Sequence, residues 1–227
     1  MSSPIANPHR TGLQESLVWF HQCIAHTNRI GRLSDEIGRT IESLFPDDNR
    51  TVRALDVGCG DMTIVETITT KRPGIEWTCT DIHELPAHLS KTEKWKKYRQ
   101  FNGSTLPFSD SAFDAVLFSD VLHHCLPLAP ALLREAARTS RYVIVKDHFE
   151  SGWVSRSKLR LLDFIGNYGY GVSVPDRYFT PESFSATALQ SGLEIVHMNA
   201  KVSIYPGWIS PILPPSLQFI AVLEKSK

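Results

Sequence analysis

The stretch that decides the fold is Val52-Arg53-Ala54-Leu55-Asp56-Val57-Gly58-Cys59-Gly60-Asp61-Met62. An apolar run ends at an acid, and two glycines one residue apart follow. The next apolar residues have helical spacing: Ile64, Val65 and Ile68. This order predicts a buried strand, a tight turn and a helix. Glycines suit such a turn because, without a Cβ, the backbone can turn sharply and approach a ligand closely.

The surroundings of this turn restrict the ligand that it could bind. Thr63 stands where a dinucleotide-binding turn has its third glycine, and no Gly-Lys-Ser/Thr of a phosphate loop follows. Asp56 would repel a phosphate but suits a cationic ligand. A second predicted strand, Ile75–Thr80, ends at Asp81, about twenty residues after the second glycine, where an acid can accept hydrogen bonds from both hydroxyls of a ribose.

These features resemble the class I S-adenosylmethionine-dependent methyltransferases. The strand and turn Leu55–Gly60 match their glycine-rich motif, and Asp81 matches their ribose-binding acid. The elements Leu106-Pro107-Phe108 and Phe113-Asp114 also resemble the family, so that the likeness covers residues 51–149 well. Val145–His148, with Leu162–Asn167 after it, is similar to a subgroup of small bacterial methyltransferases. Met62 departs from the pattern, since the family usually has a third glycine there.

The resemblance implies S-adenosyl-L-methionine as the cofactor and places its binding residues. In the family, an acid or amide just after the third strand holds the adenine amine, and Asn102 and Gly103 occupy that place here. The complete set expected to bind the cofactor is Asp56, Gly58, Cys59, Gly60, Asp81, Ile82, Asn102, Gly103 and Ser119.

Alternating strand and helix patterns predict an α/β fold with a Rossmann-like, doubly wound, mostly parallel sheet of about seven strands and helices on both faces. We expect one methyltransferase domain. Its parts are an N-terminal helical cover (1–50), a cofactor-binding core (51–149), a lid insert (150–181) and a C-terminal helix with strands (182–227). The expected helices outside the core turn are Gly12–Asn28, Arg32–Phe45, Pro86–Lys96, Leu126–Thr139 and Pro181–Ser191. The first two either lie over the cofactor site or cover one face of the sheet.

The segment 150–181 differs in character from the rest of the chain, because it is rich in aromatic residues and is interrupted by glycines. In this fold such an insert commonly forms a lid over the substrate, although an aromatic insert packed in the core is the other reading. A lid of this composition favours a small, apolar or aromatic acceptor.

Composition limits the partners. The 227 residues carry 24 basic and 24 acidic side chains, and the densest basic cluster, Lys91–Arg99, is mixed with acidic and aromatic residues, so no nucleic-acid surface is indicated. Cys59 lies in the turn and Cys79 in a predicted strand, which argues against a disulfide framework. No signal peptide or apolar run long enough to span a bilayer is visible. We therefore expect a cytoplasmic enzyme, a monomer or homodimer, with a small-molecule substrate and no integral membrane segment.

Methyl transfer is an in-line displacement that needs positioning, and a hydroxyl acceptor also needs a base. The fourth and fifth predicted strands, Ala115–Ser119 and Arg141–Lys146, are neighbours in this fold. Their carboxyl ends should bring together Asp120, His123, His124, Asp147 and His148. We expect His124 or His148 to be the base, with His123 equal in chemistry but facing the core. Alternatively, each histidine caps a helix or hydrogen-bonds a neighbouring aspartate.

Other functions compete with O-methylation of a small metabolite by a histidine base. Asp120 and Asp147 could bind magnesium, as acids do in the catechol-type methyltransferases, but His148 replaces the expected asparagine, and we expect no metal. Met62 raises the alternative of a non-catalytic or impaired cofactor-binding domain. Thr63 and Asp56 argue against a dehydrogenase. Neutral charge and the lack of an Asn-Pro-Pro-Tyr/Phe element after the fourth strand argue against a nucleobase methyltransferase.

Overall fold

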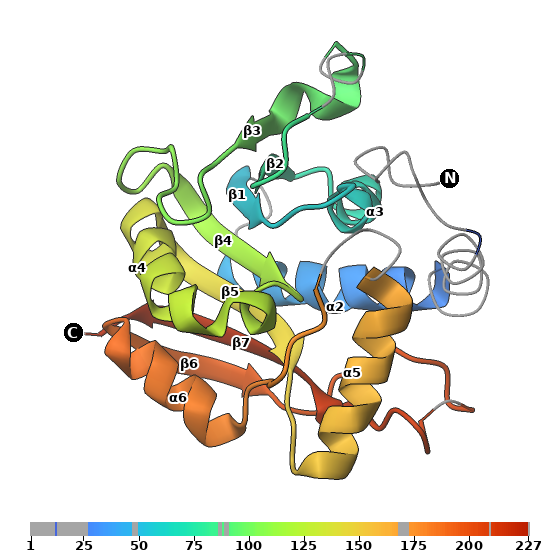
Figure 1. Ribbon diagram of the computed structural model, residues 1–227. Coiled ribbons are helices and arrows are strands. Elements are labelled where there is room, and N and C mark those ends of the chain that lie inside the picture. The colour runs from blue at the N-terminus through green and yellow to red at the C-terminus, as the bar shows by residue number, and fades with distance from the viewer. Residues whose placement is uncertain are drawn as a thin grey trace.

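A mixed sheet with the strand order β3-β2-β1-β4-β5-β7-β6 forms the centre of the molecule (Figure 1). The computed structural model describes residues 12, 27–46, 50–85, 88, 91–167, 173–208 and 210–226. The strands found in these residues are β1 (Val52–Val57), β2 (Ile75–Asp81), β3 (Tyr98–Gln100), β4 (Phe113–Ser119), β5 (Ser140–His148), β6 (Leu193–Asn199) and β7 (Gln218–Lys225).

The sheet is parallel from β3 through β5. β7 then pairs antiparallel with β5, and β6 pairs antiparallel with β7. The prediction of a Rossmann-like, mostly parallel sheet of about seven strands is confirmed for the described residues. Because β1 lies between β2 and β4, the glycine-rich turn after β1 stands at the middle of the carboxyl edge, the side of the sheet where the parallel strands end.

Helices cover both faces of the sheet (Figure 1). α2 (Thr27–Leu44) and α3 (Thr63–Lys71) lie on one face, whereas α4 (Ala129–Thr139) and α6 (Pro181–Gln190) lie on the other. Successive strand residues point to opposite faces, so Ala54 packs with the first pair of helices and Leu55 with the second. Burial on both faces explains the apolar runs Ala115–Phe118 in β4 and Val143–Val145 in β5.

Several predicted helices differ from those in the structure. α2 begins at Thr27, five residues before the expected start at Arg32, so it includes the last two residues of the predicted helix Gly12–Asn28. Of the rest of that predicted helix, the structure describes only Gly12. The segment Leu126–Thr139 begins with the 3-10 helix η3 (Leu122–Leu128), and the α-helix starts only at Ala129. Proline explains this, because Pro127 lacks an N–H and Pro130 is tolerated in the first helical turn.

The predicted helix Pro86–Lys96 is wrong where the structure describes it. His88 lies in a turn, and the regular structure is the short 3-10 helix η2 (Glu93–Lys97); residues 86, 87, 89 and 90 lie outside the description. Trp95 is the buried residue of η2. One buried side chain provides too little packing to stabilise a longer α-helix.

The segment after β5 contains α5 (Trp153–Asn167), which lies at the carboxyl edge of the sheet (Figure 1). Phe149 and Phe179 form a parallel bridge, and the Glu150 N–H donates to the Phe179 carbonyl at 2.8 Å. The two ends of the insert are therefore joined side by side. None of the helices described here is apolar over a length that would cross a lipid bilayer.

Candidate active site

The glycine-rich turn adopts backbone conformations that favour glycine. Gly58 has a φ of 76° and Gly60 a φ of 50°. A Cβ on Gly58 would lie 2.5 Å from Val121 Cγ2, so a larger residue would collide with the loop after β4. A Cβ on Gly60 would meet no atom of the described residues within 4 Å, so these residues leave open space in front of the turn. The structure therefore provides a close-packed turn that faces an open space.

Asp81 fixes this turn from the neighbouring strand. The Gly60 N–H donates to Asp81 Oδ2 at 3.1 Å, and the His83 N–H donates to Asp81 Oδ1 at 3.3 Å. A carboxylate has about four lone-pair sites, so Asp81 can still accept hydrogen bonds from two ribose hydroxyls. Ile82, exposed next to it, approaches Gly103, where an added Cβ would lie 3.3 Å from Ile82 Cγ2. These two residues form an apolar wall suited to a flat base.

The side-chain oxygen of Asn102 is engaged in the turn that follows β3. Its Oδ1 accepts hydrogen bonds from the Ser104 N–H at 3.0 Å and from the Thr105 N–H at 2.8 Å. The Ser104 hydroxyl donates to the same oxygen at 3.0 Å. Because three donors already occupy this oxygen, it holds the turn and is poorly placed to accept the adenine amine as well.

Asp56 on β1 and Ser119 at the end of β4 lie beside the turn that contains Cys59. Burial, and then the charge of Asp81, raises the pKa of Asp56 to about 7. A hydrogen bond with Cys79, followed by burial, raises the pKa of the Cys59 thiol, so Cys59 stays uncharged. The Ser119 hydroxyl oxygen is buried and has no hydrogen-bond partner within the described parts of the chain. A ligand with a positive centre, hydroxyls and polar atoms fits this set.

Met62 does not fill the open space before the turn. Its side chain is fully buried in the core beside α3, with Val65 and Ile68. Its φ of 62° is a left-handed conformation, which explains why a glycine suits this position in relatives of the fold. The residues of the turn therefore fit S-adenosylmethionine despite this departure.

At the ends of β4 and β5, the structure brings together the acids and histidines expected there. The Asp120 N–H donates to the Lys146 carbonyl at 2.9 Å, which joins the two strand ends. His148 Nε2 lies 3.2 Å from Asp120 Oδ1, and His123 Nδ1 lies 2.6 Å from Asp147 Oδ1. The three histidines nevertheless differ in environment.

His123 is a buried cation. Its Nδ1 faces Asp147, and its Nε2 lies 3.4 Å from Asp163 Oδ2 on α5. Burial alone would lower the pKa of His123, but Asp147 and Asp163 outweigh burial and raise the pKa to about 10. A histidine that already carries its proton at neutral pH cannot accept one from a substrate.

His148 is neutral, but both of its ring nitrogens are engaged. Gln218 Nε2 donates to His148 Nδ1 at 2.8 Å, because an amide nitrogen can only donate. The other nitrogen, Nε2, faces Asp120. Burial, and then the charge of Lys146, lowers the pKa of His148 to about 4. It therefore lacks a nitrogen that could take a proton from an acceptor without loss of one of these contacts.

His124 differs from both neighbours because it is only half-buried. Its Nδ1 lies 3.2 Å from the Ser173 carbonyl, an atom that can only accept, so Nδ1 carries the proton and Nε2 is the basic nitrogen. Burial, and then the positive charge of His123, lowers the pKa of His124. The ring is neutral at neutral pH in the tautomer that a general base needs.

Charged residues that the sequence analysis did not identify complete the cluster. Lys146 is fully buried and forms an ion pair with Asp120, and Arg29 at the start of α2 forms a second one. Lys146, then His148 and Arg29, overcome the effect of burial and hold the pKa of Asp120 well below its usual range. A lysine directly after the apolar run Val143–Val145 was the available sequence signal. Nothing in the sequence indicated Arg29.

Residues of the insert 150–181 also contact this cluster of acids and histidines. Asp163 on α5 accepts a hydrogen bond from the Tyr178 hydroxyl at 2.5 Å and faces His123. The Ser173 carbonyl contacts His124. Two histidines of the carboxyl edge are thus covered by side chains and backbone from residues 150–181, the segment predicted to form a lid.

The cluster has little room for a metal ion. Atoms of His123, His148 and Asp163 that could ligate a metal lie within 4.8 Å of one another. However, a protonated His123 has no lone pair to offer. Asp120 and Asp147, the ligands considered from the sequence, are held by Lys146 and Arg29 and by His123. The cluster contains three cations and three carboxylates, which balance one another without a further charge. The cations are Arg29, His123 and Lys146, and the carboxylates are Asp120, Asp147 and Asp163.

Comparisons with known proteins agree with this reading of the fold. Residues 55–141 match the family model described as a methyltransferase domain. No curated protein matches the chain.

Three solved structures are similar in fold. A SAM-dependent methyltransferase from Aquifex aeolicus has a TM-score of 0.55 at 10% identity, covering 83% of this chain and 89% of its own. The CurJ carbon methyltransferase has a TM-score of 0.62 at 16% identity, and the match covers 94% of this chain and 59% of the CurJ chain. The mitomycin 7-O-methyltransferase MmcR has a TM-score of 0.54 at 16% identity, and the match covers 87% of this chain and 53% of the MmcR chain.

The match to the methyltransferase model contains the turn after β1, Asp81 and the carboxyl edge of β4. The strand order places these parts around one open space, and their chemistry fits a cationic sulfur and a ribose. The chain therefore contains a methyltransferase domain, matched over residues 55–141, within the fold that S-adenosylmethionine-dependent methyltransferases share.

Proposed function

We propose that this enzyme methylates a hydroxyl of a small, apolar or aromatic metabolite, in a biosynthetic role in the cytoplasm, and that His124 is the general base. The observation that carries the proposal is the tautomer of His124, with Nδ1 held by the Ser173 carbonyl and Nε2 basic. His123 is already protonated and both nitrogens of His148 are held by buried neighbours, whereas His124 is half-buried and its pKa is lowered, so it is neutral and is the best candidate among the three.

The chemistry needs three contributions from the chain. Gly58, Gly60 and Asp81 hold the cofactor, which supplies an electrophilic methyl group on a positive sulfur. The insert excludes water from the carboxyl edge and positions the acceptor. His124 Nε2 takes the hydroxyl proton as the oxygen attacks, and the nearby Asp147 and Asp163 favour the charge that the ring gains.

The test measures methyl transfer from labelled cofactor to a panel of phenols and other hydroxyl compounds, followed by identification of the labelled product in cell extract. His124→Gln should lower kcat by about a hundredfold or more while cofactor affinity is kept. His148→Gln should lower kcat by less than about tenfold, because it would affect only the positions of the reacting groups. The exposed His197→Gln on β6 is a matched control and should change nothing.

The pH dependence gives a second readout. A base is active when neutral, so kcat falls as pH falls through its pKa. Because the pKa of His124 is lowered by burial, kcat should stay constant to below about pH 6.5, the ordinary histidine value. Full turnover by the His124 variant would mean that the acceptor is an amine, a carbon or an anion, and that catalysis is by positioning alone.

The two alternatives are separated by simple measurements. Magnesium that restores activity lost to a chelator would assign Asp120 and Asp147 as metal ligands, whereas the proposal expects no effect of a chelator. Cofactor binding without transfer to any compound would favour an impaired cofactor-binding domain.

A further inference from the structure

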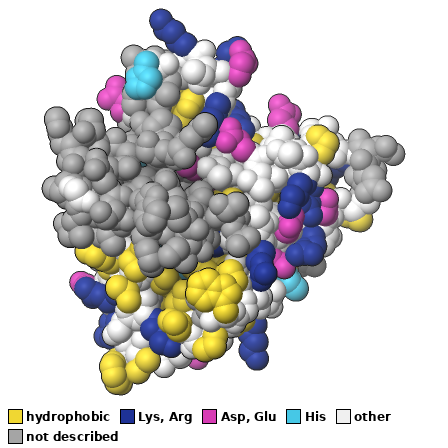
Figure 2. Space-filling view, turned by 90° about the vertical axis from the view of Figure 1, so that its right-hand side faces the viewer, with side chains coloured by type: hydrophobic (Ala, Val, Ile, Leu, Met, Phe, Trp, Pro, Cys, Tyr) yellow, Lys and Arg dark blue, Asp and Glu magenta, His cyan; other side chains and the backbone are white. Residues whose placement is uncertain are grey.

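Hydrophobic side chains gather in the lower part of the side that Figure 2 shows, where α5 lies. Phe164 on α5 has an interaction partner, so this group is not an open surface. An open edge of the central sheet lies elsewhere, at β6, which Figure 1 shows as the lowest strand, with α6 in front of it.

The two edges of the sheet differ in length and composition. β3, at one edge, has three residues, whereas β6, at the other, has seven. No strand of the described chain pairs with the outer side of β6. Val196 on β6 is 46% exposed, and Ile195 and Met198 are only partly buried. An edge strand of this length presents a row of backbone N–H and C=O groups with which a further strand can pair. We call the outer side of β6 the β6 edge.

A β-bulge interrupts the middle of β6. Ile195 pairs with Leu223 of β7 and His197 pairs with Val222, so Val196 is an extra residue in the register with β7. Bulges blunt many sheet edges, but they also shift the alternation of side chains between the two faces by one residue. This shift determines how β6 can pair with a second copy of itself.

The shifted alternation makes β6 complementary to itself. Ile195 and Met198 lie on the face covered by α6 although they are three residues apart. Glu194, His197 and Asn199 are exposed on the other face. Residues directly opposite each other in an antiparallel pair share a face. With a twofold axis just before His197, Ile195 faces Met198 of the second copy and Glu194 faces Asn199. Apolar residues then face each other, and no two like charges do.

We propose that two copies of this chain associate by antiparallel pairing of their β6 edges, which joins the two sheets into one. The pairing satisfies the outer backbone groups of β6 and covers Ile195 and Met198. An isologous contact closes on itself, so it gives a dimer and not a fibre. One strand pair is a small contact, so we expect a dissociation constant on the order of micromolar.

The dimer leaves the proposed active site accessible. β4, β5 and β7 separate β6 from β1, so the second copy lies away from the glycine-rich turn. The proposal therefore goes beyond the proposed function and does not rest on it.

The experiment is sedimentation velocity of the full chain at several concentrations from about 1 to about 200 micromolar. Asn199→Lys should lower the dissociation constant of the dimer by about tenfold, because it places a cation opposite Glu194. Asn199→Glu should raise it by about tenfold, because it places like charges opposite each other; the twofold axis makes each change act at two pairs. Both variants lose the same hydrogen bond from the Lys201 N–H, so their difference isolates the charge.

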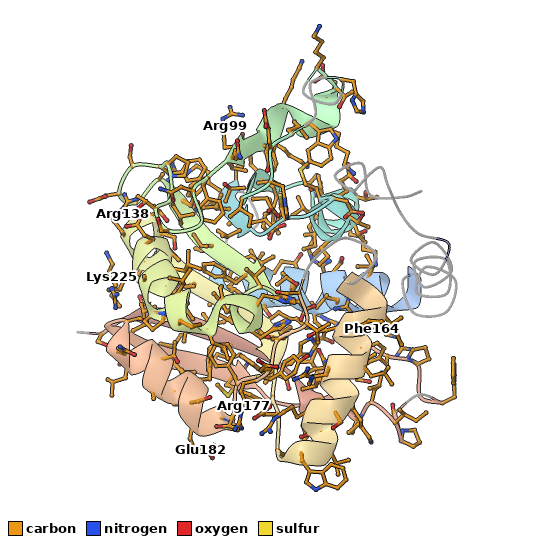
Figure 3. The ribbon with its side chains drawn as sticks, in the orientation of Figure 1. Arg99, Arg138, Phe164, Arg177, Glu182 and Lys225 are labelled. Carbon is orange, nitrogen blue, oxygen red and sulfur yellow. The ribbon has the colours of Figure 1, made fainter. Side chains whose placement is uncertain are left out.

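Two further variants complete the test. Glu194→Lys combined with Asn199→Glu brings opposite charges together again and should dimerise more tightly than Asn199→Glu alone. Arg99→Glu reverses an exposed charge on β3, at the opposite edge of the sheet, and should leave association unchanged (Figure 3). Thermal unfolding would verify that each variant is folded.

Two outcomes would overturn the proposal. One is a wild-type chain that sediments as a monomer at every concentration. The other is a dimer with the same dissociation constant in Asn199→Lys and Asn199→Glu, which would place the contact on another surface. Methyl transfer should be unaffected by these variants, so failure of this proposal and failure of the proposed function can be distinguished.

Discussion

We propose that Asp81 links the glycine-rich turn to the cofactor, because its carboxylate holds the Gly60 N–H and still has free lone-pair capacity. Asp81→Ala should weaken S-adenosylmethionine binding by about 1–3 kcal/mol, the cost of leaving ribose hydroxyls and a backbone N–H without an acceptor. Isothermal calorimetry measures this difference. Asp110→Ala, which removes an exposed acid after β3, is the control and should bind normally. Equal affinities of wild type and Asp81→Ala would contradict the assignment.

Asp56 should make cofactor binding depend on pH. Its pKa of about 7 means that the Asp56 carboxyl group of the free enzyme is only partly ionised at neutral pH. A positive sulfur favours the ionised carboxylate, so affinity for S-adenosylmethionine should rise as pH rises from about 6 to about 8, by up to about tenfold. The uncharged sulfur of S-adenosylhomocysteine should show a smaller rise.

The variant Asp56→Asn cannot ionise at this position and should bind S-adenosylmethionine with the same affinity across this pH range. Calorimetry at several pH values in buffers of different ionisation enthalpy would also count the proton released. If the wild type shows no proton release, Asp56 lies too far from the sulfur to sense its charge.

At the scale of elements, the two ends of the insert 150–181 are joined to each other at its base. The buried Glu150 carboxylate pairs with Arg156 at 2.8 Å and with Arg177 at 3.4 Å, and it accepts from the Tyr178 N–H at 3.3 Å. Arg177 lies between α5 and α6 (Figure 3). We expect the insert to open as a unit, with its two ends held together, while α5 keeps its own structure.

We expect protease to cut residues 150–181 more readily in the free enzyme than with cofactor and acceptor bound. Glu150→Gln should increase cutting of the free enzyme, because it weakens the contacts at the base. Glu182→Gln, an exposed acid at the start of α6, is the matched control. Mass spectrometry of the fragments would locate the cuts. Identical digestion with and without ligands would count against a moving lid.

At the scale of the whole molecule, the buried ions at the carboxyl edge join α2, β4, β5 and α5. His123 joins β5 and α5 through Asp147 and Asp163. His123→Gln should lower the free energy of unfolding by about 3–5 kcal/mol, because two buried carboxylates lose their partner. Urea unfolding measures the change, and the double variant with Asp147→Asn should recover part of it.

The same residue sets a pH limit on stability. Its pKa is raised from an ordinary value of about 6.5 to about 10, so its contribution is fully present below the first value and is lost as pH rises through the second. Stability of the wild type should therefore fall at alkaline pH more steeply than that of His123→Gln. Parallel curves for the two proteins would show that His123 is neutral in the folded state.

The sequence by itself determined the features that depend on local pattern and chain order. The apolar strand before Gly58, the alternation of strands with helices and the acid at Asp81 predicted the sheet and the cofactor-binding turn. Strand order also predicted that Asp120, Asp147 and the three histidines meet at one edge. These inferences succeeded because strand pairing and glycine conformations follow from short-range properties of the chain. The helix predicted for residues 86–96 was wrong in its described part, because a helix there would have had too little core to pack against.

Only the tertiary structure distinguishes the three histidines by charge, burial and hydrogen bonding. His123, His124 and His148 have the same side chain, but their pKa values are shifted in different directions by Asp147 and Asp163, by burial and by Lys146. Arg29 and Asp163 reach the cluster from α2 and α5, far away in the sequence. Proton affinity depends on every charge within a few ångströms and on access to water, and the folded chain sets both.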